Sequence, residues 1–269
     1  MQAASRTGAT GAASKPVRYG PSADGFGPLA IDGPVWVDNL ETIYRTDPTT
    51  VAAVLPPPLA PGPDPVVRVS ISTASDDRGA TTGVARVSVQ ASWDTMVGEY
   101  VLFVGATTEA EALNARERFG EPAHQVDITS TINGQRRIAN RVVRLGQTVV
   151  QIVGMVEEPE PPERAVRTEF AFRIIRSVSD PSALAADPEL VAITRSVEER
   201  KAAKVAGIVR LGHSPIDPVR DLVVRHTDRP RLAQQFVTIG AKVVDEVPAA
   251  DFLPYVHQRY DHVAEARRR

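Results

Sequence analysis

Three side chains able to perform acid–base chemistry lie close together in the segment from Arg116 to His124. Histidine exchanges protons near neutral pH, so His124 is the first candidate for a catalytic acid or base. Glu117 adds a carboxylate, and the Arg116 guanidinium can hold an anionic oxygen with paired hydrogen bonds. Each residue has a structural alternative. A strand histidine is often a hydrogen-bonded structural residue, and Arg116 with Glu117 can form an ion pair that anchors a helix end.

Other residues could line a substrate cavity beside this segment. Ser70 could hydrogen-bond a substrate carbonyl, and Arg68, Trp36, Trp93 and Tyr100 are candidates for the cavity wall. Aromatic residues more often serve the core alone, and a serine in a strand usually has no special role. The substrate-binding and the structural interpretations both remain open for these positions.

Several classes of chemistry lose their usual support in this sequence. The chain has no cysteine, which excludes disulfides, thiolate nucleophiles and Cys-type metal sites. Four histidines form no recognised ligand spacing: His213, His226, His257 and His262. The sequence contains no nucleophile elbow, P-loop or dinucleotide fingerprint. We therefore expect neither a metal nor a cofactor.

Length and charge limit the partners and the domain number. A chain of 269 residues without a long low-complexity linker suits one domain, so we predict a flexible leader over residues 1–20 and a single domain over 21–269. The net charge of −2 offers no strong field for nucleic acid or an anionic membrane. No apolar run approaches the roughly 18 to 20 residues that span a bilayer. A cytoplasmic protein with a small-molecule partner is the expectation.

Short strands dominate the expected secondary structure. Alternating apolar and polar residues, with the turn Asn133-Gly134, predict a series of strands. The predicted strands cover residues 35–44, 66–72, 84–89, 100–104, 124–128, 137–145, 148–156, 170–175, 205–211 and 221–224. The predicted helices cover 47–55, 108–118 with a left-handed stop at Gly120, a charged segment from 187 to 204, and 249–268; residues 157–163 are expected to form a loop or a lid. This mainly β pattern with a few helices (α+β) favours a closed or strongly curved antiparallel sheet.

The order of several short motifs resembles the acetoacetate decarboxylase family. The motifs are Tyr44-Arg45-Thr46-Asp47, Leu55-Pro56-Pro57-Pro58-Leu59, Gly98-Glu99-Tyr100, Arg116-Glu117 with Pro122, and a weaker C-terminal echo from Asp217 to Val224. Each motif alone is weak, but their order and the ungapped spacing from Tyr100 to Pro122 are specific. The resemblance implies the family's β-cone, a closed antiparallel sheet around a central cavity, in a homo-oligomer.

The same resemblance puts the family's mechanism in doubt for this chain. In the family, the first lysine after the proline forms a Schiff base with a ketone, and a second lysine depresses its pKa. These positions are Ala123 and His124 here, and Ser70 stands where the family places a carboxylate. The sequence has four lysines, Lys15, Lys201, Lys204 and Lys242. Lys242 is the least excludable substitute because it follows an apolar strand pattern.

We therefore predict a lyase-type enzyme of specialised metabolism that acts on a carbonyl-bearing organic acid or polyketide-like molecule without an imine. His124 and Glu117 would move protons, Arg116 would hold an anionic oxygen, and Ser70, Arg68, Trp93, Tyr100 and Ala123 would contact the substrate. Dehydration, cyclisation, aldol chemistry and decarboxylation all pass through a stabilised enolate. Two alternatives stay open: a non-catalytic binding protein that retains the family cavity, and a decarboxylase with a relocated lysine.

Overall fold

The computed structural model describes residues 36–75, 81–134, 136–214 and 216–259. The predicted leader lies outside these residues. The strands are β1 (Val37–Arg45), β2 (Ala60–Pro61), β3 (Val66–Ser75), β4 (Thr81–Trp93), β5 (Met96–Ala106), β6 (Ala123–Gln125), β7 (Asp127–Ile132), β8 (Arg137–Arg144), β9 (Gln147–Glu160), β10 (Arg164–Arg173), β11 (Glu189–Leu211), β12 (His226–Thr227) and β13 (Arg231–Glu246). The helices are α1 (Pro48–Val54), α2 (Glu109–Asn114) with a π-helical continuation (Ala115–Phe119), a 3-10 turn (Val219–Asp221), and α3 (Ala249–Phe252) with a 3-10 continuation (Leu253–Arg259).

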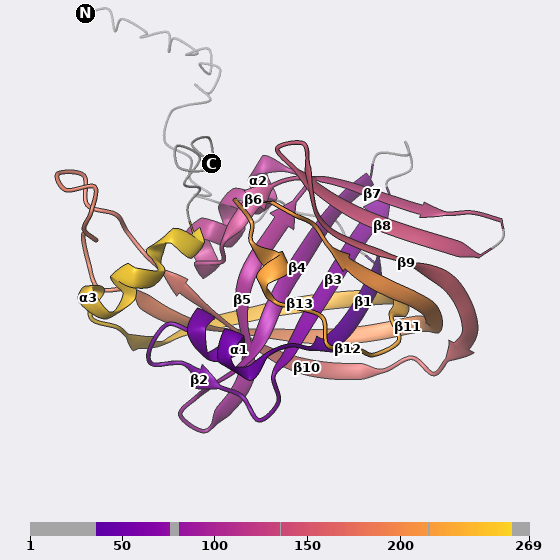
Figure 1. Cartoon of the computed structure of the whole chain (residues 1–269), viewed down its shortest axis with the longest axis horizontal. Helices are drawn as coiled ribbons and strands as arrows, with labels where there is room; N and C mark the ends of the chain where they lie inside the picture. The colour runs from indigo at the N-terminus through magenta and orange to yellow at the C-terminus, as the bar shows by residue number, and fades with distance from the viewer. Residues whose placement is uncertain (1–35, 76–80, 135, 215, 260–269) are drawn as a thin grey trace, which may run out of the picture. The chain divides into compact units, whose positions relative to one another are not determined.

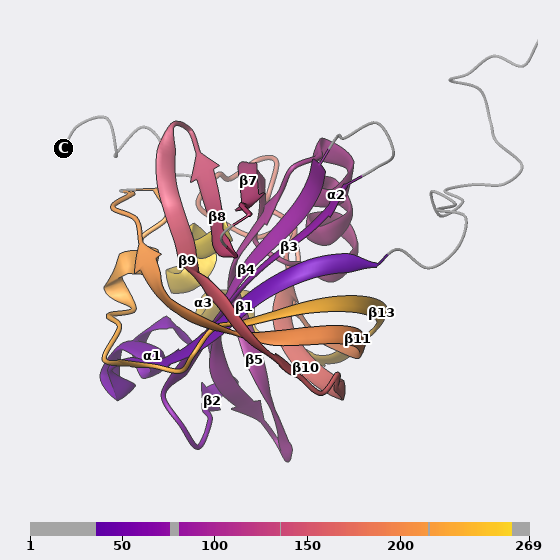
Figure 2. The ribbon, with the colours of Figure 1, turned by 90° about the vertical axis from the view of Figure 1, so that its right-hand side faces the viewer.

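Seven of the strands close into a barrel. Their order is β10-β5-β4-β3-β1-β13-β11, and pairing between β10 and β11 closes the ring. Most joints are antiparallel, whereas β5 pairs in parallel with both β10 and β6. The predicted mainly β fold with a closed sheet is confirmed, and the parallel joints make the sheet mixed. Beyond the ring, β11 also pairs with β9, which continues the sheet through β8 to β7 (Figures 1 and 2).

The main hydrophobic core lies on the outer face of the barrel wall. Strand side chains alternate between the two faces, and in β3 the fully buried Val67, Val69 and Ile71 all point to this core. Elements outside the ring contribute Val51 of α1 and Phe252 of α3, as well as residues of β8 and β9. Because these elements cover the apolar side of the strands, the other side of the same strands faces the interior of the barrel.

Local sequence signals explain the helices that position the site. Asp47 caps α1, accepting a hydrogen bond from the Thr49 backbone N–H at 2.9 Å, and the prolines that follow end the helix. The predicted helix at 108–118 is confirmed, although its second half is π-helical. It ends as predicted at Gly120, whose φ of 74° is left-handed. A side chain at Gly120 would lie 2.5 Å from the Arg173 backbone nitrogen, so glycine also permits the helix end to approach β10.

Several predicted elements were wrong. The segment predicted to open a helix at 187–188 and continue to 204 is instead the first part of β11. Its backbone is paired on both sides over most of its length, which outweighs the helical appearance of its charge run. Residues 221–224 are not a strand, because Asp221 ends a 3-10 turn and the next three residues are irregular. Strand β9 extends to Glu160, into the predicted loop. The predicted C-terminal helix is α-helical over Ala249–Phe252 and 3-10 up to Arg259, and its remainder lies outside the described residues.

Within the described part of the chain, no helix has the length and apolar character needed to cross a membrane.

Candidate functional site

Charged side chains fill the interior of the barrel. Strands β1 and β10 are not neighbours in the ring, yet Glu41 of β1 accepts a hydrogen bond from Arg167 of β10 at 2.6 Å. Arg86 of β4 likewise reaches Glu169 of β10, with β5 between their strands, at 4.0 Å. Contacts that skip neighbouring strands require these side chains to point inward. The interior is therefore polar, while the outer face of the same strands is apolar.

The first group of interior charges is centred on Arg68. Its Nη1 donates to Glu41 at 2.5 Å and its Nε donates to Glu99 at 2.6 Å. Glu41 also accepts two hydrogen bonds from Arg167, at 2.6 and 3.1 Å, and Glu99 accepts one from the Ser88 hydroxyl at 2.6 Å. Burial would raise the pKa of Glu41, but Arg68 and Arg167 outweigh burial and hold this pKa below its ordinary value of 4.5. Glu41 is therefore ionised at neutral pH.

The second group is more deeply enclosed. Arg195 donates to Glu121 at 2.7 Å and to Glu169 at 2.6 Å, and Arg86 donates to Glu121 at 3.4 Å. The side chain of Glu121 is 1 % exposed and those of Arg195 and Glu169 are each 8 % exposed. Burial alone would lower the pKa of Arg195, but the two carboxylates raise it. Such enclosure is tolerated because each charge has an opposite partner.

The positive and negative charges of the two interior groups are equal in number. We use the name luminal charge network for Arg68, Arg86, Arg167, Arg195, Glu41, Glu99, Glu121 and Glu169. The network contains equal numbers of positive and negative groups, so its formal charge is zero. Its side chains come from six strands of the ring and from the loop between the π-helical segment and β6.

Ser70 lies between the two groups. It is directly opposite Glu41 on β1 and directly opposite Arg86 on β4. Its side chain is half-buried, and its hydroxyl makes no hydrogen bond to another residue in the described ranges. A polar group in this position has hydrogen-bonding capacity left for a guest in the barrel. Of the predicted substrate contacts, the structure thus brings Ser70 and Arg68 together at the network.

Ala123 closes the barrel interior on an apolar side. It is fully buried in a cluster with Val101 and Val104 of β5 and with Ala112 and Ala115 of the helical segment above them. Helix α2 contacts β5 and β6 at this end of the barrel (Figure 1). The position that the resemblance assigns to an imine-forming lysine therefore holds a methyl group packed among apolar side chains.

The three predicted catalytic residues lie in different environments. His124 follows Ala123 in β6 and so points to the opposite side of the strand, where its ring stacks on Phe103 at 6.1 Å between centroids. Phe103 belongs to the outer hydrophobic core. Glu117 is exposed and makes no ion pair or hydrogen bond with a described residue, whereas Arg116 is half-buried and has a contact. Glu117 is therefore not joined to His124 or Arg116.

The two aromatic substrate candidates belong to the outer core. Tyr100 is 3 % exposed, its hydroxyl donates to Gln258 at 2.8 Å, and its ring meets Phe172 edge-on at 6.0 Å. Burial raises the pKa of the Tyr100 phenol above its ordinary value. Trp93 packs against the same core and donates to Asp245 at 3.1 Å. Trp36, just before β1, contacts Phe236 with its ring tilted at 45° and 6.1 Å between the centroids.

The lysines offer no substitute for Ala123 within the described part of the chain. Lys201, Lys204 and Lys242 are all exposed, and Lys204 pairs with Glu160 at 3.5 Å. Lys15 lies outside the described residues. In the same ranges, no group of three histidine or acidic side chains is arranged to hold a metal ion.

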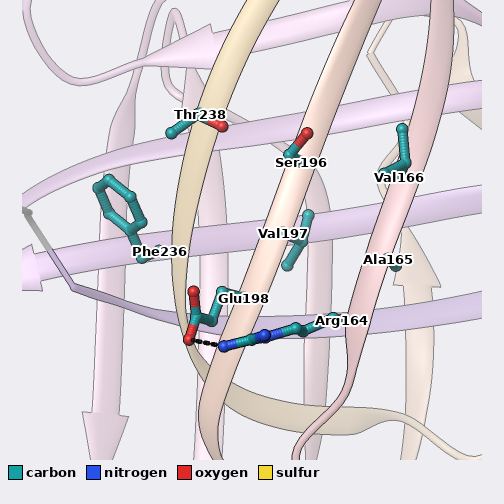
Figure 3. A pocket seen from close by; sticks show the side chains of 8 residues that line it. All are labelled: Arg164, Ala165, Val166, Ser196, Val197, Glu198, Phe236 and Thr238. Carbon is teal, nitrogen blue, oxygen red and sulfur yellow. Dashed lines mark hydrogen bonds and ion pairs between the residues drawn. The ribbon is translucent and has the colours of Figure 1, made fainter.

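A hollow of about 390 Å³ lies on the outer surface, away from the network. Figure 3 shows β10, β11 and β13 in the foreground, crossing the paler strands behind them. The hollow is lined by Arg164, Ala165, Val166, Ser196, Val197, Glu198, Phe236 and Thr238. Arg164 pairs with Glu198 at 2.7 Å there, with side chains 80 % and 48 % exposed. This pair provides an exposed counterpart to the buried pairs inside.

Sequence reasoning missed most of the network. Glu41, Glu99, Glu121 and Glu169 each sit in or beside a strand whose other face is apolar, as do Arg86, Arg167 and Arg195. One signal in the sequence could have found these residues: each is a charged residue within or beside an apolar strand. A charged side chain is rarely buried unless it is paired, so such a residue predicts a buried ion pair. Sequence alone does not show which charges meet, because the partners come from distant strands.

Comparison with known proteins agrees with this architecture. The sequence matches the family described as acetoacetate decarboxylase (ADC) over residues 14–247. No curated protein matches the chain. Among solved structures, acetoacetate decarboxylase from Legionella pneumophila subsp. pneumophila str. Philadelphia 1 has 16% identity and a TM-score of 0.68, over 80% of this chain and 88% of that one.

The enduracididine biosynthesis enzyme MppR has a similar fold in two solved complexes. Its pyruvate complex has 16% identity and a TM-score of 0.67, over 87% of this chain and 99% of that one. Its complex with the condensation product of pyruvate and imidazole 4-carboxaldehyde has 17% identity and a TM-score of 0.66, over 86% and 97%. At these identities the structures establish the fold, and the match over most of the sequence establishes the relationship. The chain belongs to the acetoacetate decarboxylase family.

Proposed function

We propose that this protein binds a small carbonyl-bearing organic acid inside the barrel and converts it by acid–base chemistry without an imine. The observation that carries the proposal is the Ser70 hydroxyl, which has no hydrogen bond to a described residue and lies beside paired arginines and glutamates. Ala123, at the position that the resemblance assigns to a lysine, supports a mechanism without an imine. Family membership supports a small-molecule carbonyl acid as substrate. MppR, solved with pyruvate and with a pyruvate condensation product, supports the same class of compound.

The interior supplies the groups that enolate formation needs. An arginine of the network would hold the substrate carboxylate, and Ser70 would donate a hydrogen bond to its carbonyl oxygen. Glu99, held by Arg68 and Ser88, would take the proton from the carbon next to the carbonyl. The C–H electron pair then forms a carbon–carbon double bond, and the carbonyl electrons move to the oxygen near Ser70. Dehydration, cyclisation and aldol addition can proceed from this enolate, whereas decarboxylation of a 3-keto acid forms an enolate when the carbon–carbon bond to the carboxylate breaks and CO2 leaves.

This proposal moves the chemistry from the predicted residues to the network. His124, Glu117 and Arg116 remain the alternative catalytic set, but the exposure of Glu117 and the outward stacking of His124 favour Ser70 and Glu99. A non-catalytic binding protein is the second candidate. It is favoured by the mutual pairing of all network charges, which suits a stable scaffold. The proposed setting is a cytoplasmic homo-oligomer in specialised metabolism.

Product formation from a panel of 2-keto and 3-keto acids, followed by NMR, tests the proposal. Ser70→Ala should lower kcat by about 100-fold, the order expected for loss of one oxyanion donor. Ser196→Ala, on the outer surface, is the matched control and should retain full turnover. Comparable loss in His124→Ala but not in Ser70→Ala would instead support the set predicted from the sequence.

Borohydride trapping separates the remaining mechanisms. The intact protein, treated with borohydride and the compound that is consumed, should keep its mass because no imine forms. A reduced adduct would refute the imine-free mechanism and lead to a lysine. No consumption across the panel, with saturable binding of one compound, would favour the binding protein.

A further inference from the structure

The carboxylate of Glu41 accepts hydrogen bonds from two arginines, an arrangement that would also bind the carboxylate of a ligand. It accepts from Arg68 at 2.5 Å and from both terminal nitrogens of Arg167 at 2.6 and 3.1 Å. The two arginines come from different sides of the barrel, on β3 and β10. Guanidinium forks of this kind recognise carboxylates in general, whether these come from the chain or from a small molecule.

Arg68 and Arg167 are among the more accessible members of the luminal charge network. Their side chains are 21 % and 29 % exposed, compared with 8 % for Arg195. Solvent therefore reaches the two arginines that hold Glu41, as it reaches Arg86 at 20 % exposure, whereas Arg195, Glu121 and Glu169 are enclosed. A small acid therefore reaches these two arginines more readily than it reaches Arg195.

Charge balance determines what can bind there. The network is neutral, so a guest carboxylate added to it would leave one uncompensated negative charge in a confined interior. If the guest carboxylate replaces that of Glu41 on the two arginines, the arginines keep one negative partner. The displaced Glu41 can then take up a proton, which removes the extra negative charge. The cheapest way for an acid to enter is thus to replace a carboxylate that is already present.

We propose that Glu41 occupies the anchoring site for the substrate carboxylate, and that a small carboxylic acid binds by replacing Glu41 on Arg68 and Arg167. This inference rests on the proposed function, whose site it specifies. The guest class is an acid with one free carboxylate, because one carboxylate already saturates the fork. Glu41 is then a resident competitor, and its release adds a protonatable group beside the bound acid.

The charged groups around Glu41 determine which residue takes up the proton when a guest acid binds. Arg68 faces it from β3 and Arg167 from β10, and Arg231 is its register neighbour on β13. Arg231 is already engaged by Glu199 at 2.8 Å, and Glu99 is engaged by Arg68. Once a guest holds the fork, Glu41 lacks the arginines that kept it ionised, so it is the group that takes up the proton.

Carboxylate rescue of Glu41→Gln tests this inference. The variant leaves the fork unoccupied, so its thermal unfolding midpoint should rise saturably with formate, acetate or pyruvate. Sodium chloride at matched ionic strength should have little effect. Glu198→Gln is the matched control, because it makes the same substitution in the exposed pair with Arg164 (Figure 3). Its midpoint should not respond to carboxylates beyond the response of the wild type.

Binding affinity provides the quantitative form of the test. If Glu41 leaves Arg68 and Arg167 free in less than about a tenth of wild-type molecules, pyruvate should bind Glu41→Gln at least about tenfold more tightly than it binds the wild type. Calorimetry in buffers of different ionisation enthalpy should show proton uptake on binding to the wild type and none for the variant. If Glu41→Gln folds only with carboxylate present, its refolding yield against pyruvate concentration gives the same readout.

The possible failures are distinguishable. Equal carboxylate responses of Glu41→Gln and Glu198→Gln would overturn the inference, even if the wild type turned over a keto acid. Rescue of Glu41→Gln without turnover of any acid by the wild type would support the anchoring site and contradict the enzymatic proposal.

Discussion

Removal of Arg195 should be the most damaging single change to the luminal charge network. Arg195→Met preserves the bulk of the side chain while leaving Glu121 and Glu169 facing each other without the guanidinium between them. Each lost charge pair is worth about 4 kcal/mol at roughly 4 Å in a medium of effective dielectric constant about 20. Arg86 lies 3.4 Å from Glu121 and 4.0 Å from Glu169, so its positive charge offsets part of the lost electrostatic stabilisation.

We therefore expect Arg195→Met to lower the free energy of unfolding by about 4 kcal/mol, within the range of about 3 to 5 kcal/mol found when one partner of a buried pair is removed. For a domain of this size the thermal midpoint should fall by about 8 to 16 °C. Urea unfolding at pH 7 measures the loss. Arg164→Met, which breaks the exposed pair with Glu198, is the matched control and should cost less than about 1 kcal/mol.

A second substitution identifies the cause. Glu121→Gln added to Arg195→Met should restore part of the lost stability, because it neutralises one of the two stranded carboxylates. A loss below about 1 kcal/mol for Arg195→Met would refute the reasoning, since it would mean that water reaches these groups and screens them. A large loss that Glu121→Gln worsens would assign the damage to packing and not to charge.

Three further predictions concern single residues. Burial opposes ionisation of Glu41, but two arginines hold its pKa below 4.5, so its ionised form stabilises the fold above pH 4.5 and this contribution is lost as the pH falls through the lower folded value. The stability difference between wild type and Glu41→Gln, followed by urea unfolding, should be constant near neutral pH and shrink below pH 4.5; a constant difference down to pH 3 would contradict it. Gly120→Ala should cost more than about 1 kcal/mol because of its positive φ and the contact with the Arg173 backbone, and a neutral result would show that the helix end can shift. Asp47→Ala should lower the thermal unfolding midpoint through loss of the cap, whereas Asp47→Asn, whose side chain can also accept the capping hydrogen bond, should lower it less.

Much of the fold could be predicted from local patterns. The alternation in β3 and β4, the cap at Asp47 and the left-handed stop at Gly120 are encoded by neighbouring residues. The wrong helix over 187–204 shows the limit of such patterns. In β11 the hydrogen bonds of two partner strands decide the conformation, and those partners lie far away in the sequence.

The candidate site was less predictable than the fold. Arg68 and Ser70 could be recognised as polar residues on a strand, and the structure places both at the network. Glu41 and Arg167 are 126 positions apart, so their contact depends on closure of the barrel. His124 and Ala123 are adjacent in sequence but face opposite sides of β6, a distinction that a motif does not contain.

The joint between β5 and β10 differs from the other joints of the ring. These strands share two paired positions, whereas β10 and β11 share ten. At this short joint Glu99 and Glu169 stand directly opposite each other, and the arginines that neutralise them come from β3 and β11. Like charges placed opposite each other repel. Side chains from other strands thus hold the ring together here. A guest that competes for Arg68 would therefore weaken the joint between β5 and β10.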